Sequence, residues 1–140
     1  MQLELIINFE GNCREAVDFY AKVFHSEVKN VMTYGQAPAH PDYPVAEADM
    51  NKILYCDIQI GGITVMCMDM PTGYPLILGN NINPTVSMTN KEEVERVFNE
   101  LSEGGEVFME LQQTFFSELY GMLKDPFGVI WQVLYYNREG

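Results

Sequence analysis

An internal repeat restricts the folds that are open to this chain of 140 residues. A strand pattern, an amphipathic helix pattern and further strand patterns occur first in residues 1–70 and again in residues 80–140. The two helix patterns align at a constant offset through these pairs: Asn12 and Asn90, Glu15 and Glu93, Phe19 and Val97, Val23 and Leu101. One βαβββ module alone would leave a face of its sheet exposed. We therefore expect a single α+β domain of residues 1–140, in which two tandem βαβββ modules form a cup-shaped mixed sheet, a natural ligand pocket.

Apolar periodicity predicts where the elements lie. The predicted strands are residues 3–9, 28–34, 53–60, 63–69, 82–88, 106–111, 119–124 and 129–136. Each helix is expected to begin after an asparagine N-cap, Asn12 or Asn90, with a glutamate three positions later as in a capping box. Residues 36–50 contain three prolines and are predicted to form a long loop, of a length that is often functional.

The last predicted hairpin places one polar side chain within an apolar strand. Residues 125–128 (Asp-Pro-Phe-Gly) are typical of a tight turn, and residues 129–136 after it are nearly all apolar. Gln132 is the exception, and two interpretations are open: a core glutamine with satisfied hydrogen bonds, or a residue that lines a pocket. Since successive strand residues point to opposite faces, Trp131 is expected to face the helices and Gln132 the cup.

The charge balance excludes some classes of partner. The net charge is −12 and the pI is near 4.3, whereas nucleic acids and anionic membranes are bound through Lys and Arg patches. No apolar run approaches the ~18 residues of a membrane span, and the first residues lack a signal-peptide pattern. The three cysteines are odd in number and show no C-x-x-C spacing. A disulfide framework is not expected, and a cytoplasmic location is the simplest expectation.

Few side chains are candidates for catalysis. Asp57 lies on a predicted strand and is the candidate general base, although a solvent-facing or paired carboxylate is the favoured interpretation. Cys13 lies beside a helix N-terminus, a position that can lower a thiol pKa, but a small apolar residue at a helix start explains it as well. Met66 and Met68 are either core residues or an adaptable apolar pocket wall.

Three motifs resemble a known superfamily. They are NFEGNCREAVDFYAKVF at residues 8–24, KILYCDIQIGG at residues 52–62 and QQTFFSELYGMLKDPFGVIWQV at residues 112–133. Together with the repeat, they resemble the vicinal oxygen chelate superfamily (glyoxalase I, bleomycin-resistance proteins and extradiol dioxygenases) and, within it, the PhnB-like branch. This chain departs from the branch at Tyr55, where a His is usual, and at Phe116-Ser117, where Trp-Gly is usual.

The resemblance also bears on metal binding and on methyl transfer. Metal-using members of the superfamily place His or Glu on four central strands, and the matching positions here are Glu4 or Ile6, Met66 or Met68, residues 83–85, and Gln132. Only Glu4 is a strong ligand, so we expect no bound metal or other cofactor, with a divalent ion as the alternative. Some relatives are described as ubiquinone-pathway methyltransferases. Gly104-Gly105, however, follows a predicted helix, whereas a nucleotide-binding glycine loop precedes one.

The resemblance implies a binding function, which we expect to involve a small, largely apolar molecule in the cup. A metal-dependent lyase, isomerase or dioxygenase and a metal-free acid/base enzyme are the alternatives, so whether the chain is an enzyme stays open. A homodimer is expected, and the predicted loop at residues 36–50 is its candidate arm. The expected ligand-binding residues are Gln132, Tyr120, Met122, Met66, Met68, Phe115, Phe116 and Tyr55.

Overall fold

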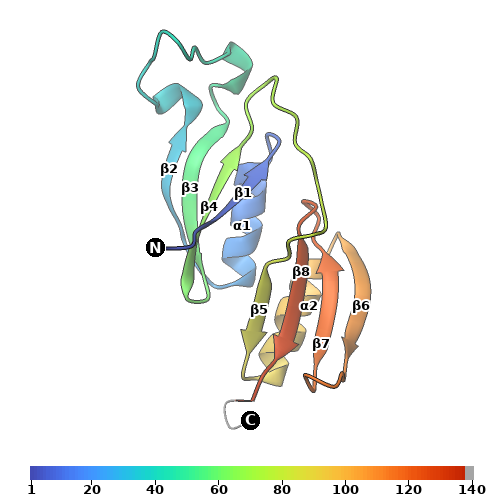
Figure 1. Ribbon diagram of the computed structural model, residues 1–140. Coiled ribbons are helices and arrows are strands. Elements are labelled where there is room, and N and C mark those ends of the chain that lie inside the picture. The colour runs from blue at the N-terminus through green and yellow to red at the C-terminus, as the bar shows by residue number, and fades with distance from the viewer. Residues whose placement is uncertain (138–140) are drawn as a thin grey trace. The chain divides into compact units, whose positions relative to one another are not determined.

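The computed structural model describes residues 1–137, and the chain divides into two compact units, Met1–Ile77 and Leu78–Gly140 (Figure 1). Each unit is a βαβββ module, which confirms the predicted α+β class and the predicted tandem repeat. Within residues 1–137, no helix is long and apolar enough to cross a membrane.

The first unit is a four-stranded mixed sheet with one helix on it, as far as residues 1–137 are described. Its elements are β1 (Leu5–Phe9), α1 (Cys13–Val23), β2 (Val28–Thr33), β3 (Ile53–Ile60) and β4 (Ile63–Asp69). The strand order is β1-β4-β3-β2, with β1 parallel to β4 and the other pairs antiparallel. The predicted loop at residues 36–50 connects β2 to β3 and contains short 3₁₀ turns at its two ends, Tyr34–Gln36 and Glu47–Asp49.

The second unit repeats this topology. Its elements are β5 (Thr85–Met88), α2 (Lys91–Ser102), β6 (Glu106–Gln112), β7 (Tyr120–Lys124) and β8 (Ile130–Tyr135). The strand order is β5-β8-β7-β6, with β5 parallel to β8. In each unit the last two strands of the module, β3 and β4 or β7 and β8, form the centre of the sheet, and the first strand lies parallel to the last at one edge.

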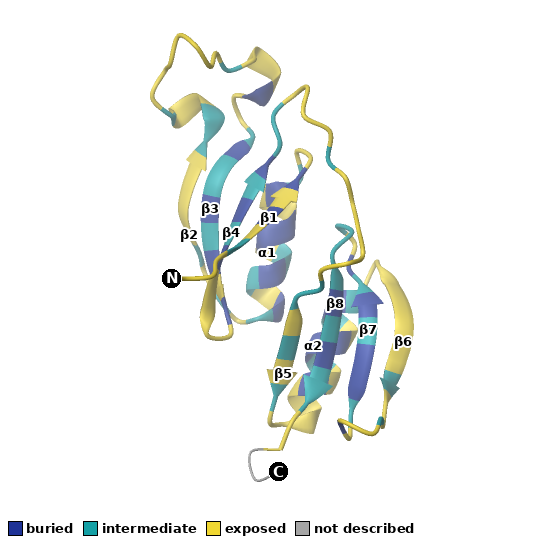
Figure 2. Cartoon of the chain, viewed as in Figure 1, coloured by how far each residue is buried: buried dark blue, intermediate teal, exposed yellow. Residues whose placement is uncertain are grey.

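Each helix covers one face of its own sheet, and apolar side chains on that face form the core (Figure 2). In the first unit the buried core includes Phe9, Val17, Tyr20, Cys56, Ile58 and Val65. In the second unit it includes Val94, Phe98, Leu101, Leu123, Trp131 and Val133. Helix α2 lies so close to β7 that a Cβ at Gly121 would come within 2.6 Å of the Phe98 ring. Only glycine fits at that crossing.

The predicted starts of β1 and β5 are wrong because strand pairing begins later in the sequence than the apolar pattern does. β1 begins at Leu5 rather than at residue 3, since Leu3 is 97% exposed and has no strand partner among the described residues. β5 begins at Thr85 rather than at residue 82, because its ladder with β8 begins where Thr85 faces Gln132.

The two predicted N-caps have different outcomes. The Asn90 side chain accepts a hydrogen bond from the Glu93 N–H at 3.1 Å, as predicted. The Asn12 side chain makes no cap to α1, so that prediction is wrong. The Asp69 carboxylate, at the end of β4, accepts the Gly11 and Cys13 N–H groups at 2.8 and 2.9 Å instead. A charged acceptor held at a helix N-terminus serves the same purpose as a local cap.

Candidate functional site

The face of the second sheet that α2 does not cover carries a group of predicted site residues. Trp131 and Val133 pair across the ladder with Leu123 and Gly121 on the helix side. By alternation, Gln132 and its partner Met122 lie on the opposite face. The exposed fraction of Trp131 is 1%, whereas Gln132 is only half-buried, so the predicted division of these neighbours between the two faces is correct.

Gln132 is the centre of a chain of hydrogen bonds. The Tyr120 hydroxyl donates to Gln132 Oε1 at 2.8 Å, and Gln132 Nε2 donates to Asn83 Oδ1 at 3.2 Å. Asn83 Nδ2 in turn donates to the Asn80 carbonyl at 3.4 Å. The Gln132 amide nitrogen carries two N–H groups, and Asn83 accepts only one of them. The second N–H makes no hydrogen bond within residues 1–137.

A short loop presents two phenylalanines beside this face. The Ser117 N–H donates to Thr114 Oγ1, and the Thr114 N–H donates to the Ser117 carbonyl at 2.8 Å, which closes a tight turn. The turn places Phe115 and Phe116 toward solvent, with 100% and 55% of their surface exposed. The Phe116 ring stands edge-on to Tyr120 with ring centroids 5.0 Å apart. Phe116 and Tyr120 therefore form one aromatic group.

Ser117 is a buried residue of this loop whose side chain contacts the backbone just before β7, at Leu119, and at the end of β8, at Tyr135. Its hydroxyl lies 2.7 Å from the Tyr135 carbonyl and 2.9 Å from the Leu119 carbonyl, and it accepts the Leu119 N–H. The Ser117 side chain therefore fastens the aromatic loop to the end of β8.

In the first unit, the other predicted site residues lie on the face that α1 leaves uncovered. Cys56 pairs with Cys67 on the helix side, so Asp57 and its partner Met66 lie on the opposite face. Tyr55 lies there too, since its hydroxyl donates to Asp57 Oδ2 at 3.2 Å. Burial, together with that hydrogen bond, raises the pKa of Tyr55. Met68 follows Met66 at the next position of the same alternation.

Asp57 is a hydrogen-bonded carboxylate, and the sequence reasoning missed one of its partners. Asn30 Nδ2 donates to Asp57 Oδ2 at 2.8 Å. Asn30 adopts φ +57° where the register between β2 and β3 shifts, and this left-handed backbone turns its side chain toward β3. The sequence hints at this contact only through the presence of an asparagine, a residue that tolerates left-handed backbone, within a strand of mixed polarity.

The structure thus brings the predicted residues together in two groups, one in each unit. Gln132, Tyr120, Met122 and Phe116 form the group of the second unit, with Phe115 beside them in the loop. Tyr55, Met66, Met68 and the candidate base Asp57 form the group of the first unit. Glu4 precedes β1, is exposed, and lies outside the paired strands.

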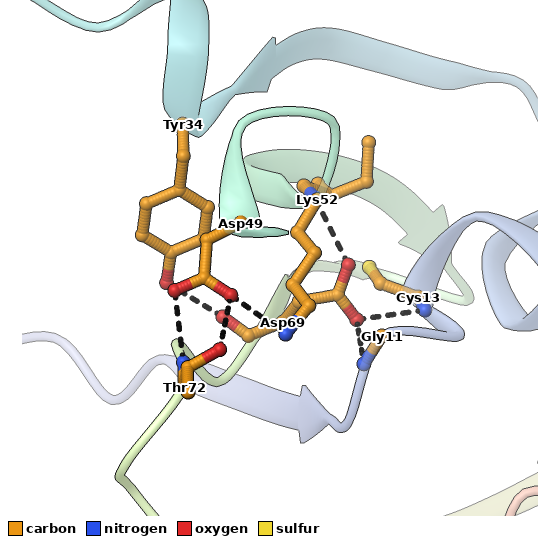
Figure 3. Close-up of polar contacts among 8 residues, drawn as sticks. Gly11, Cys13, Tyr34, Asp49, Lys52, Asp69 and Thr72 are labelled. Carbon is orange, nitrogen blue, oxygen red and sulfur yellow. Dashed lines mark hydrogen bonds and ion pairs between the residues drawn. The ribbon is translucent and has the colours of Figure 1, made fainter. Parts of the chain in front are cut away.

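A third polar cluster, which the sequence reasoning did not predict, holds the start of β3 (Figure 3). Asp49 accepts hydrogen bonds from the Thr72 N–H at 2.9 Å and the Thr72 hydroxyl at 2.7 Å, and it pairs with Lys52 at 2.8 Å. The Lys52 and Thr72 hydrogen bonds lower the pKa of Asp49 to about 2. The Tyr34 hydroxyl donates to the Asp69 carbonyl at 2.7 Å. The Asp49 carboxylate is bonded by Thr72 and Lys52, and the Asp69 carboxylate accepts the Gly11, Cys13 and Ile53 N–H groups. Because both carboxylates have these partners, the cluster stabilises the fold rather than forming a reactive site.

The cysteines do not form a nucleophilic site. Cys13, Cys56 and Cys67 are buried, with the Cys13 and Cys56 sulfur atoms 3.9 Å apart. The hydrogen bond to Cys56 and burial raise the pKa of Cys13, contrary to the lowering that its helix-terminal position suggests. Burial raises the pKa of Cys67 to about 12. The hydrogen bond with Cys13 lowers the pKa of Cys56, but all three thiols are buried, and a thiol that no reactant can reach is a poor nucleophile.

The residues present do not fit a divalent metal centre. Among residues 1–137, no group of three or more His, Cys, Asp or Glu side chains could hold an ion. At the positions matched to metal-using relatives, Met66 and Met68 offer soft thioethers, and the Gln132 amide oxygen already accepts from Tyr120.

Comparisons with known proteins extend over nearly the whole chain. The family model described as 3-demethylubiquinone-9 3-methyltransferase matches residues 2–134. The crystal structure of protein PA1353 from Pseudomonas aeruginosa is 31% identical in sequence, with a TM-score of 0.87 over 98% of each chain. The putative 3-demethylubiquinone-9 3-methyltransferase, PhnB protein, from Bacillus cereus is 25% identical, with a TM-score of 0.80 over 97% of this chain and 100% of that chain. Protein YjdN of Escherichia coli (strain K12) is 26% identical over 140 residues, which are 95% of this chain and 94% of that protein.

Proposed function

This chain belongs to the family described as 3-demethylubiquinone-9 3-methyltransferase, the PhnB-like branch of the vicinal oxygen chelate superfamily, and from that premise we propose that it binds a small, largely apolar molecule without a metal ion. The ligand is flat and carries one hydrogen-bond acceptor. Its binding residues in the second unit are Gln132, Tyr120, Met122, Phe115 and Phe116. In the first unit, Tyr55, Met66 and Met68 have the same role on the corresponding sheet face.

The observation that carries this proposal is the remaining N–H of Gln132, which lies beside apolar side chains on the uncovered face of the second sheet. The amide is held in one orientation by Tyr120 on one side and Asn83 on the other, so its remaining donor has a fixed direction. Met122 lies opposite Gln132 on β7, and Ile130 and Leu134 flank it on the same face of β8. A fixed donor among apolar side chains selects a ligand by one hydrogen bond and by apolar contact area.

Phe116 adds an aromatic step to the binding surface. Its ring is 55% exposed and stands edge-on to Tyr120, which is buried and donates its hydroxyl to Gln132. Aromatic rings prefer offset or edge-on partners, which favours a planar ligand at this step. Met122 supplies a flexible thioether that adapts to ligands of different outline.

One observation favours a second candidate function, a metal-free acid/base enzyme. Asp57 lies on the uncovered face of the first sheet, and its two side-chain donors within residues 1–137, Asn30 and Tyr55, use the same oxygen. The other oxygen is available to accept a proton from a bound molecule. A metal-dependent lyase, isomerase or dioxygenase has no comparable support, because the matched positions carry weak ligands.

The proposal is tested with Nile red, a flat, neutral dye that carries a carbonyl acceptor, by fluorescence titration. We expect saturable binding that Gln132→Ala weakens by about two- to tenfold, the range for one lost hydrogen bond. Asn99→Ala, which removes an exposed amide from α2, is the matched control and should leave the affinity unchanged. Mass spectrometry of compounds that co-purify with the chain would identify a natural ligand. Unchanged affinity in Gln132→Ala, or the lack of saturable binding, would contradict the proposal.

A further inference from the structure

A hollow of about 400 Å³ lies at the end of the second unit where the β6–β7 loop meets the end of β8. These two segments are at the lower end of that unit in Figure 1. Its walls include four aromatic residues and one carboxylate: Phe115, Phe116, Tyr135, Tyr136 and Glu118. We infer that this hollow binds a small organic cation, such as a quaternary ammonium or a protonated amine. The inference does not rest on Gln132: the hollow shares Phe115 and Phe116 with the proposed ligand site, but neither Gln132 nor its hydrogen-bond partners line it.

The aromatic walls have the chemistry that organic cations require. The Phe115 and Phe116 rings are 5.2 Å apart and stand edge to face, so their ring faces point in different directions. Both phenylalanines are more than half exposed, and Tyr136 is 41% exposed. Aromatic faces attract cations through the ring quadrupole, and clusters of such faces recognise quaternary ammonium groups.

The chain already places one of its own cations on this wall. The Lys91 ammonium lies 5.2 Å from the centroid of the Tyr135 ring. The same ammonium pairs with Glu118 at 2.6 Å, and this contact raises the pKa of Lys91. Tyr135 and Glu118 both line the hollow, so the structure itself demonstrates a cation held by one ring and one carboxylate at this place.

Lys91 can give way to a ligand. The Lys91 and Glu118 side chains are 53% and 56% exposed, and an exposed ion pair contributes little stability. A ligand cation that enters the hollow would take over Glu118 while the lysine returns to water. The net charge of −12 raises the local concentration of any cation near the chain, which favours this exchange at low salt.

The test compares choline with its neutral carbon isostere, in which a tert-butyl group replaces the trimethylammonium group. The full chain is titrated with each compound and followed by heteronuclear NMR. We expect choline to shift resonances of the hollow residues and the isostere to bind at least several-fold more weakly. Glu118→Gln should weaken choline binding by about threefold, because the carboxylate supplies the charge.

A second variant separates the inference from a loss of folding. Lys91→Met keeps an unbranched side chain but removes the competing ammonium, so choline should bind about threefold more tightly. Glu103→Gln changes the net charge by the same amount as Glu118→Gln, at an exposed position outside the hollow, and it should have no effect. Equal affinity for choline and its isostere, no binding of choline, or weaker binding by Lys91→Met would each overturn the inference.

Discussion

At the scale of single residues, Trp131 joins two stabilising effects in one side chain. Its ring is buried beneath α2, and its indole Nε1–H donates to Asp125 Oδ2 at 2.8 Å. Asp125 Oδ1 accepts the Phe127 and Val129 N–H groups of the β7–β8 turn at 2.9 and 3.0 Å. The buried carboxylate therefore connects the turn to the core.

We predict that Trp131→Ala lowers the free energy of unfolding by about 3–5 kcal/mol, as for other large buried aromatics. Trp131→Phe keeps most of the volume but leaves the carboxylate without the indole donor, and it should cost about 1–3 kcal/mol. Gln132→Ala should cost less than Trp131→Ala because that face is half-buried. Urea unfolding of the three variants measures these differences. A larger loss for Gln132→Ala than for Trp131→Ala would show that the two faces of β8 are assigned wrongly.

Alternation along β8 was sufficient to predict where Trp131 and Gln132 point, because a strand has a fixed period of two. It could not predict what each side chain bonds to. Asn83 precedes β5 and is far from Gln132 in the sequence, so its role depends on the pairing of β5 with β8. Asp125 is close to Trp131 in the sequence, but their contact depends on how the turn between β7 and β8 folds. Local sequence patterns do not encode such pairings.

At the scale of elements, the two modules reach one topology through different polar contacts. The Asn-x-x-Glu pattern occurs at both helix starts, yet only Asn90 caps its helix. In the first unit, Asp69 also accepts the Ile53 N–H at 2.9 Å, so one carboxylate connects the ends of β4, α1 and β3. The charged Asp69 carboxylate, with its three N–H donors, takes the place of the neutral Asn12 side chain as the cap of α1. Asp69 reaches the start of α1 only when the sheet has folded.

The contact between Asp49 and Thr72 gives a prediction about acid stability. The pKa of Asp49 is lowered to about 2 from 3.8, so its contribution to stability is fully present above pH 3.8 and is lost as the pH falls toward about 2. We expect Asp49→Asn to have a lower melting temperature than the parent at neutral pH, and this gap should shrink through that window. Melting curves over a pH series test the prediction. Asp42→Asn, an exposed substitution in the same loop, is the control, and a constant gap for Asp49→Asn would contradict the argument.

At the scale of the whole molecule, we predict that the purified chain contains no stoichiometric transition metal. Met66, Met68 and Gln132 stand at positions where the resemblance leads us to expect metal ligands, and thioether and amide groups bind zinc, nickel or iron weakly. Elemental analysis of protein prepared without chelators is the measurement. Stoichiometric metal that Glu4→Ala removes would contradict the prediction, whereas metal unaffected by that substitution would indicate adventitious binding.

The last prediction concerns assembly. β6 is an edge strand of its sheet, and its exposed side chains include Val107, Phe108 and Met109. An apolar edge with free backbone donors and acceptors favours pairing with another chain. We therefore expect a homodimer, with a mass by light scattering of twice 16.0 kDa at micromolar concentration.

Phe108→Lys should shift the mass toward the monomer with an unchanged circular dichroism spectrum, because a buried lysine would oppose the contact. Glu110→Gln changes the net charge by the same amount on the same strand and should remain dimeric. A monomeric parent chain would refute the prediction, and a dimeric Phe108→Lys variant would place the interface elsewhere, with residues 36–50 as the next segment to test.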